Sequence, residues 1–470
     1  MNKYKKLISN TFILTAGTFL SKLLVFFMMP FYTYLLSPEY YSVADLIMQS
    51  ANLLIPLACV GISEALFRFA LDKSKNKEVV FSTGICVMTV FSVLFLALSP
   101  LILLIDYFKS YAWLIALYVV ASNYHSAAAQ FVRAKEKMRL FAVQGIIGTV
   151  LTILFNVLFL LAFRWGIVGY VLSVAAADIV TTVFLVIYAK LYKSFKIKLF
   201  DFSMAKRMIL YSLPLVPTTI CWWVTSVSDR YIVTAHFGDA VNGLYSAAYK
   251  IPTLLTLVAN CFIEAWHVSA VNDTTEADEG NFFGKVFESY MGIIFSSCAV
   301  IIALTKPLTI LLYAVDYYMS WRYIPVLLGA TAFAGLVSYL GSVYVLKMKP
   351  IYSFVTSLIG AVLNIGLNLL FIDEWGAMGA AVATFLSYLV VFLIRVPLSL
   401  SLLKFNIHPV KIVINTTIIL IQTFTMLYDI KYWIVIQIVA VIAIIVINLR
   451  PVIRGTLGVM KKYLRKAKKI

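Results

Sequence analysis

Apolar runs of roughly 20 residues follow one another along the whole chain, with short polar breaks between them. At 1.5 Å per residue, a helix of about this length spans the hydrocarbon core of a bilayer. Of the 470 residues, 62% are hydrophobic and 13% are charged, whereas an average soluble domain is about 45–50% apolar and about 25% charged. The sequence therefore predicts an all-α polytopic membrane protein without a soluble domain.

The apolar runs divide into about fourteen predicted transmembrane helices. The N-terminal stretch has the basic start of a signal peptide, but its apolar part continues to Leu36, which is too long for a cleaved segment, so we expect it to remain as the first helix. The predicted spans are 8–36, 42–70, 79–105, 111–132, 139–163, 167–190, 208–236, 242–270, 284–306, 322–346, 351–372, 376–400, 408–428 and 432–450.

Lysine and arginine gather in alternate breaks, for example DKSKNK at 72–77, RAKEKMR at 133–139 and KSFKIK at 193–198, and in the C-terminal tail. Cytoplasmic loops near span ends retain positive charge, so we predict a multi-pass protein of the cytoplasmic (inner) cell membrane with both termini in the cytoplasm. The net charge of +18 is then explained by topology and by contact with anionic membrane lipids, and nucleic acid is not an expected partner.

A short pattern occurs twice, as WGIVGY at 165–170 and as WGAMGA at 375–380. Both copies open an outer turn, and they lie six predicted spans apart, so they face the same way. In each copy the first glycine permits a tight turn, and the second leaves a smooth helix start for close packing. The tryptophans fit an interfacial belt.

A second pair of similar segments, ISEALF at 62–67 and FIEAWH at 262–267, agrees with an internal duplication. Two parallel six-helix lobes related by an axis along the membrane normal are a construction that transporters use. We predict an N-terminal six-helix lobe over 1–205, a C-terminal six-helix lobe over 206–402, and two additional transmembrane helices with a basic cytoplasmic tail over 403–470.

Three stretches carry a resemblance to a known family: residues 37–72, 226–255 and 364–384, the second of them containing SVSDRY and the third NIGLNLLFIDEWGAMGA. The chain resembles the polysaccharide-transporter (Wzx-type) flippases of the multidrug/oligosaccharidyl-lipid/polysaccharide exporter superfamily over about residues 8–400. One departure is Ser42, where the family usually has a glycine. The resemblance implies a V-shaped pair of six-helix lobes. It also implies a flippase that moves an undecaprenyl-diphosphate-linked oligosaccharide, for capsule, O-antigen or a related glycan, to the outer leaflet by alternating access.

Cations within spans are costly, at about 2.5–3.5 kcal/mol each on an insertion scale, and they usually mark a cavity or a pathway. Lys22 lies near the middle of the first span, Arg230 lies near the outer end of the seventh, and Lys250 lies about two turns into the eighth. We predict that these three side chains line a cavity and bind the substrate's diphosphate. Structural alternatives remain open, namely an ion pair with Asp178 for Lys22 and an anchor at the outer interface for Arg230.

Two carboxylates within spans are candidates for a charge partner or for a coupling site. Asp178 lies midway along the sixth span, and Asp229 precedes Arg230. Asp178 is the leading titratable candidate, and whether H⁺, Na⁺ or the membrane potential drives transport is left open. Pro214 and Pro217 predict a break in the seventh span that could act as a hinge.

Other polar residues receive a milder interpretation. Asp45 and Glu64 lie near span ends, where solvated or interfacial placement is expected. His125 and His267 have no ligand spacing around them, and the five cysteines are scattered, so we predict no metal, no cofactor and no catalytic site.

Several functions compete with the flippase prediction. A drug/cation antiporter of the same superfamily would be favoured by a cavity of negative charge, and a lipid II flippase would differ only in its sugar cargo. A membrane glycan ligase or acyltransferase would need a sizeable outer loop, and the outer breaks are short. A scaffold without transport activity would need no buried cations. Glycan polymerase machinery stays open as a further partner, because these residues do not decide whether the protein contacts it.

Overall fold

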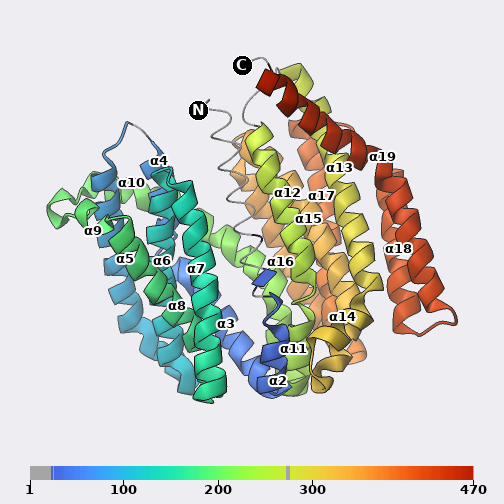
Figure 1. Ribbon diagram of the computed structural model, residues 1–470, viewed down its shortest axis with the longest axis horizontal. Coiled ribbons are helices and arrows are strands. Elements are labelled where there is room, and N and C mark those ends of the chain that lie inside the picture. The colour runs from blue at the N-terminus through green and yellow to red at the C-terminus, as the bar shows by residue number, and fades with distance from the viewer. Residues whose placement is uncertain (1–18, 20–22, 25, 73, 271–275, 469–470) are drawn as a thin grey trace. The chain divides into compact units, whose positions relative to one another are not determined.

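The computed structural model describes residues 19, 23–24, 26–72, 74–270 and 276–468, which are helical almost throughout and contain no strand (Figure 1). The earlier elements are α2 (Met29–Leu35), α3 (Pro38–Ala58), α4 (Ile62–Leu71), α5 (Lys77–Leu98), η1 (Ser99–Leu104), η2 (Asp106–Tyr111), α6 (Ala112–Ala134), α7 (Met138–Asn156), η3 (Val157–Ala162), α8 (Gly166–Tyr188), α9 (Leu191–Ser194), η4 (Ile197–Leu199) and α10 (Phe202–Ser212). The later elements are α11 (Leu215–Ala248), α12 (Pro252–Ala270), α13 (Glu276–Ala303), α14 (Thr305–Leu312), η5 (Val315–Arg322), α15 (Ile324–Leu346), α16 (Pro350–Trp375), α17 (Ala377–Leu402), α18 (Pro409–Leu427) and α19 (Trp433–Lys468).

The chain forms two compact units. The first consists of Met1–Tyr231 and Asp239–Gly243, and the second consists of Ile232–Gly238 and Leu244–Ile470. The long helix α11 therefore contributes segments to both units. The division into lobes at residues 205 and 402 stays a prediction.

The predicted all-α membrane architecture is confirmed. In the part of the chain that the structure describes, nine helices are long and apolar enough to cross a membrane, or ten when the bent pair α3 and α4 is taken as one span. A helix lies at every predicted span from 42–70 onward. The first predicted span lies mostly outside the described residues, and the total of fourteen stays a prediction.

The span predicted over 42–70 is bent rather than straight. Helices α3 and α4 meet at an angle of 53°, because Val60 and Gly61 adopt left-handed φ values of 51° and 64° that end one helix before the next begins. Helix α4 then packs closely on α5, where a Cβ added to Gly84 would lie 2.4 Å from Leu66 Cδ2. Within the first unit, the bend allows α4 to pack on α5, α6 and α10, while α3 packs on α6 and α8 at a different angle.

The two W-G-x-x-G turns have the predicted geometry, each within its own unit. Gly166 and Gly376 have φ values of 51° and 57°, which favour glycine. A Cβ on Gly169 would lie 3.1 Å from the carbonyl oxygen of Phe159, and one on Gly379 would lie 2.4 Å from that of Phe371. The second glycine is therefore needed because the new helix starts against the backbone of the preceding one.

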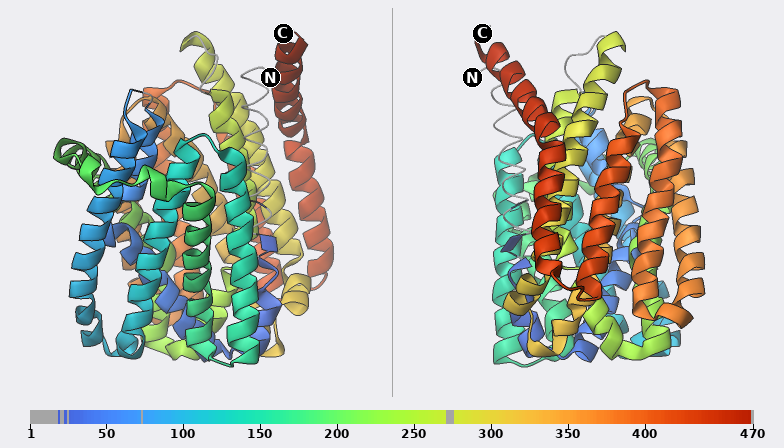
Figure 2. Two further views of the ribbon diagram at one scale, coloured as in Figure 1. Left: turned by 60° about the vertical axis from the view of Figure 1, so that its left-hand side comes forward. Right: turned by 90° about the vertical axis from the view of Figure 1, so that its right-hand side faces the viewer.

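In the second unit, α18 and α19 form an antiparallel pair beside α13 (Figure 2). Buried amides join the pair: Asn448 Nδ2 donates to Asn415 Oδ1 at 2.9 Å, and Gln422 Nε2 donates to Gln437 Oε1 at 3.0 Å. At one end, Lys306 Nζ lies 2.5 Å from an oxygen of the loop residue Asp429, between two tryptophan rings whose centroids are 4.3 Å and 4.4 Å away. Polar contacts thus fix the two additional helices to this unit.

Candidate functional site

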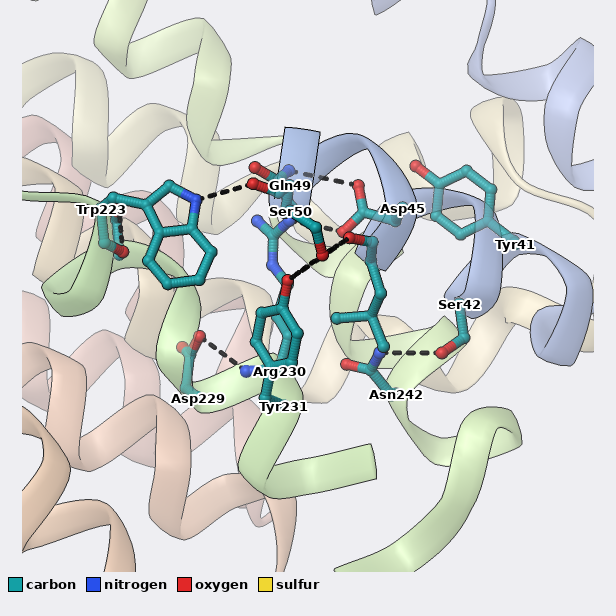
Figure 3. Close-up of polar contacts among 12 residues, drawn as sticks. Tyr41, Ser42, Asp45, Gln49, Ser50, Trp223, Asp229, Arg230, Tyr231 and Asn242 are labelled. Carbon is teal, nitrogen blue, oxygen red and sulfur yellow. Dashed lines mark hydrogen bonds and ion pairs between the residues drawn. The ribbon is translucent and has the colours of Figure 1, made fainter. Parts of the chain in front are cut away.

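Two helices, α3 and α11, carry a dense set of buried and half-buried polar side chains within the first unit. We call this set the α3–α11 cluster, and Figure 3 shows most of it. On α3 the members recur at helical spacing, which places them on one face. The cluster comprises Ser42, Asp45, Gln49 and Ser50 of α3 and Trp223, Asp229, Arg230, Tyr231, Asp239 and Asn242 of α11.

A buried ion pair lies at the centre of the cluster. Arg230 Nη1 lies 2.5 Å from Asp45 Oδ2, and the two residues are only 6% and 1% exposed. Gln49 Nε2 donates to the other oxygen of Asp45 at 3.4 Å. Each charge would be very unfavourable alone in a low-dielectric interior, so the pair joins α3 to α11 through mutual neutralisation.

The structure corrects the expectation that Asp45 is solvated or interfacial. Its position near the end of a predicted span suggested solvation, but its side chain is buried against α11. Asp229 is also fully buried, and its Oδ1 accepts a hydrogen bond from the backbone N–H of Arg230 at 2.9 Å. The cation that we predicted as a phosphate ligand is therefore paired with a carboxylate, and it lies next to a second one.

A second polar group lies where α3 begins. Ser42 Oγ donates to Asp239 Oδ1 at 2.8 Å and accepts from Asn242 Nδ2 at 2.8 Å, and Tyr107 of η2 donates to the same Asp239 oxygen at 2.5 Å. Burial and the hydrogen bond to this carboxylate raise the pKa of Tyr107, so its hydroxyl stays protonated and keeps donating. The hydroxyl of Ser42 thus makes two hydrogen bonds that a glycine at this position could not make.

Further contacts fix the alignment of α3 along α11. Trp223 Nε1 donates to the carbonyl oxygen of Gln49 at 2.9 Å, and the hydroxyls of Ser50 and Tyr231 are 2.7 Å apart. At the start of α3, a Cβ on Gly243 would lie 2.0 Å from the carbonyl oxygen of Pro38, so only glycine fits this close approach. The positive φ of Gly238, 77°, bends α11 between its two segments.

The other predicted cations lie elsewhere or outside the described residues. Lys22 is not among the described residues. Lys250 belongs to the second unit and lies in the break between α11 and α12, not two turns into an unbroken helix as predicted. Pro252 explains this correction, because a proline disfavours helical conformation in the residue before it and lacks the N–H needed to continue the helix.

The proline pair lies at the other break in this region. The helix is interrupted at Leu213 and Pro214, between α10 and α11, while Pro217 lies in the first turn of α11, where proline is tolerated. The predicted interruption is therefore present. Its use as a hinge stays a prediction.

Asp178 is paired within the first unit, but with a residue that the sequence did not assign to it. Its Oδ1 lies 2.9 Å from Nδ1 of His125 on α6, and its Oδ2 accepts a hydrogen bond from Ser122 of the same helix. The other ring nitrogen of His125 lies 2.8 Å from Oε1 of Gln144 on α7. The structure thus gives this carboxylate a histidine partner and places the two on neighbouring helices.

The sequence model of the polysaccharide biosynthesis protein family matches residues 7–267, more than half of the chain. This chain belongs to the polysaccharide biosynthesis protein family. The match covers both helices of the α3–α11 cluster and all three helices of the His125–Asp178 group. The chain is also similar to an uncharacterized membrane protein of Methanocaldococcus jannaschii. The two are 23% identical over 392 residues, which cover 77% of this chain and 90% of the relative.

Solved structures show the same fold. The lipid II flippase MurJ in an inward closed conformation matches with a TM-score of 0.67 and 17% identity, covering 95% of this chain and 99% of MurJ. A MATE structure in the straight conformation matches with a TM-score of 0.60 and 15% identity, covering 85% and 96%. A MOP superfamily transporter from Pyrococcus furiosus matches with a TM-score of 0.61 and 13% identity, over the same shares. The present chain therefore has the fold of MOP superfamily flippases and transporters, and it is a multi-pass membrane protein.

Sequence reasoning missed three important residues of the first unit. Asp45 becomes buried, and Asp239 gains its hydrogen bond from Ser42, only because α3 and α11 meet, and His125 lacked any ligand spacing along the chain. A usable signal existed for Asp45, since Ser42, Asp45 and Gln49 share one helical face. No local pattern connected His125 to Asp178, whose position is 53 residues later.

Proposed function

We propose that this protein is a flippase that moves an undecaprenyl-diphosphate-linked oligosaccharide from the inner to the outer leaflet of the cytoplasmic membrane. The observation that carries the proposal is the family match, because it covers the two helices on which the buried ion pair lies. The MOP superfamily fold is compatible with it. The glycan belongs to capsule, O-antigen or a related polymer, and the termini lie in the cytoplasm.

The Arg230–Asp45 pair supplies a mechanism for recognising the head group. A guanidinium binds carboxylate and phosphate through the same two-donor geometry. Asp45 therefore occupies, in this structure, the place on Arg230 that a diphosphate oxygen would take. Binding of the head group would release Asp45, and with it one link between α3 and α11, while return of Asp45 would expel the diphosphate at the end of the cycle.

Exchange of this kind avoids leaving a bare charge in the membrane. Arg230 keeps an anionic partner at every stage, first the carboxylate and then the phosphate, so the cost of a lone buried cation never arises. Lys22 and Lys250 are proposed as additional cations for the second phosphate. The lipid tail would remain in the bilayer while the head group crosses, and the break at Pro214 with Pro217 would provide the hinge.

A drug/cation antiporter is the second candidate, and one specific observation favours it. The α3–α11 cluster contains three carboxylates, Asp45, Asp229 and Asp239, against the single guanidinium of Arg230. A cluster of this polarity would attract an organic cation more than a diphosphate. The two candidates predict opposite effects when Asp45 is neutralised, because it would be a competitor of a diphosphate but a ligand of a cation.

Transport in proteoliposomes decides between them. A labelled undecaprenyl-diphosphate oligosaccharide would be incorporated, and its accessibility to an external glycosidase would be followed for wild type and Arg230→Ala. Arg322→Ala is the matched control, because this arginine is exposed on η5. We expect flipping by wild type and by the control, and loss of flipping in Arg230→Ala, measured at a temperature where circular dichroism shows that this destabilised variant is still folded. Export of an organic cation without any movement of the lipid-linked sugar would replace the proposal with the antiporter.

A further inference from the structure

A histidine and an aspartate form a compact polar group in the first unit that the head-group mechanism does not use. His125 Nδ1 lies 2.9 Å from Asp178 Oδ1, and Ser122 donates to Oδ2 of the same carboxylate. On the far side of the ring, Nε2 lies 2.8 Å from Gln144 Oε1. Three helices, α6, α7 and α8, thus each contribute a polar side chain to one short chain of hydrogen bonds.

This group lies well inside the helices that hold it. His125 is about 20 Å along α6 from its first residue, Asp178 is about 18 Å along α8, and Gln144 is about 9 Å along α7, at 1.5 Å per residue. The side chains of His125 and Asp178 are 22% and 18% exposed. They are therefore largely packed in protein, but each keeps an open edge.

The geometry points to a single intramembrane proton-binding site, formed by His125 and Asp178 with Gln144 as its adjustable partner. With the proton bound, the imidazolium donates from Nδ1 to Asp178 and from Nε2 to Gln144 Oε1, and the distances of 2.9 Å and 2.8 Å suit both hydrogen bonds. Without it, Nδ1–H still donates to the carboxylate, and Nε2 becomes an acceptor. A half-turn of the Gln144 amide then presents its N–H₂ in place of its oxygen.

The amide flip explains why both protonation states can exist without a broken hydrogen bond. The oxygen and nitrogen ends of a glutamine side chain have almost the same shape, so the exchange needs no movement of the helices. An apolar residue at position 144 would satisfy neither state, and a carboxylate would favour only the charged one. Gln144 is 6% exposed, so water does not easily substitute for it.

Charge balance gives the site a reason to take up a proton. The protonated pair is neutral overall, as imidazolium and carboxylate, whereas the deprotonated pair carries one negative charge. A net charge within a membrane protein is costly, so the pair accepts a proton whenever its open edge faces the more acidic side. Release of the proton on the other side of the membrane restores the single negative charge of the pair. This is the behaviour that coupling to a proton gradient requires.

The neighbouring ionisable groups are engaged with other partners or lie elsewhere on their helices. Tyr118 of α6 interacts electrostatically with Asp178, and its hydroxyl donates to Asn52 Oδ1 of α3 at 3.3 Å. Lys22 is not among the described residues. The carboxylates on α6, on α8 and on the elements packed against them have partners of their own: Asp45 pairs with Arg230, Glu64 accepts a hydrogen bond from Gln130, and Glu78 pairs with Lys196. Among the remaining groups, Arg133 lies over the ring of Phe67, and the hydroxyl of Tyr124 is hydrogen-bonded to Thr89. Arg68 and Arg139 lie at the ends of their helices.

Coupling by this site rests on the proposed flippase function, but proton binding itself does not. Nitrogen-15 NMR of histidine-labelled protein in nanodiscs therefore tests binding without any substrate. The chain has four histidines, and the His125 signals are those that disappear in His125→Gln. We expect them to change from imidazolium to imidazole within about pH 5–9. If the His125 signals stay those of imidazolium, or stay those of imidazole, over that whole range, the pair has only a structural role and the proposed proton-binding site is wrong.

Transport under an imposed pH gradient then tests coupling. One exchanged proton changes the leaflet distribution of the lipid-linked sugar about tenfold for each pH unit. We expect this response in wild type and in the control His236→Gln, whose ring is exposed on α11, and its absence in Asp178→Asn and His125→Gln. A tenfold response that persists in both site variants would refute coupling through this pair. If no lipid-linked sugar moves in any variant, the proposed function fails while the NMR titration still decides the proton site.

Discussion

The buried ion pair between α3 and α11 offers the most quantitative test of the architecture. Asp45 and Arg230 are 1% and 6% exposed, and their charged atoms are 2.5 Å apart. Removing one partner of such a buried pair leaves an uncompensated charge, which costs about 3–5 kcal/mol. We therefore expect Asp45→Ala and Arg230→Ala each to lower the free energy of unfolding by about that amount.

The double variant separates a lost pair from two independent losses. Asp45→Leu combined with Arg230→Met removes both charges and refills the volume, so its free energy of unfolding should be closer to wild type than that of either single variant. With Asp45→Leu and Arg230→Met as the single variants of this cycle, the coupling energy should be at least about 3 kcal/mol, because each single loss is about 3–5 kcal/mol and the double loss is smaller than either. The assay is reversible unfolding in mixed micelles, followed by circular dichroism.

The chain contains a matched control for this cycle. Lys196 Nζ lies 2.8 Å from Glu78 Oε2, but the two side chains are 56% and 43% exposed, so solvent screens the pair. We expect no measurable coupling there. The reasoning would be refuted if the single variants of Asp45 and Arg230 stayed within about 1 kcal/mol of wild type, or if both pairs gave the same coupling.

Three further outcomes follow from the packing. Gly379→Ala should lower the free energy of unfolding by about 1–3 kcal/mol, because its Cβ would meet a backbone carbonyl at 2.4 Å, while Gly366→Ala, with open space around it, should be neutral or stabilising in the same denaturation assay. Lys306→Met should speed proteolysis of the loop between α18 and α19, and unchanged cleavage would count against the tryptophan-lined contact. Asn415→Leu or Asn448→Leu alone should destabilise more than both together in thermal denaturation, since each single change removes the hydrogen bonds between the two amides and leaves the remaining buried amide without this partner.

Hydropathy and small-residue patterns were sufficient for much of the architecture. Apolar runs located helices because a membrane requires every backbone group to be satisfied within a helix. The W-G-x-x-G pattern also predicted local geometry correctly, since Gly166 and Gly376 adopt left-handed φ values and Gly169 and Gly379 lie against a backbone carbonyl. Both features depend on residues that are close together in the chain, and so they can be predicted from the sequence.

The polar sites were harder to predict because their partners are distant in the chain. Asp45 and Arg230 are 185 residues apart, and position near a span end could not show that one would neutralise the other. His125 was dismissed for lacking nearby ligands, although its partner lies on a neighbouring helix. The bend at Val60 was also missed, because nothing polar interrupts the apolar pattern there.

The most direct test of the central claim is the affinity of undecaprenyl diphosphate for wild type, Asp45→Asn and Arg230→Gln in nanodiscs. If a diphosphate replaces Asp45 on Arg230, removing the competing carboxylate should tighten binding about tenfold, which corresponds to about 1.4 kcal/mol. Arg230→Gln should weaken binding by at least as much. Weaker binding in both variants, or no change in either, would contradict the exchange of ion-pair partners on which the proposed transport mechanism rests.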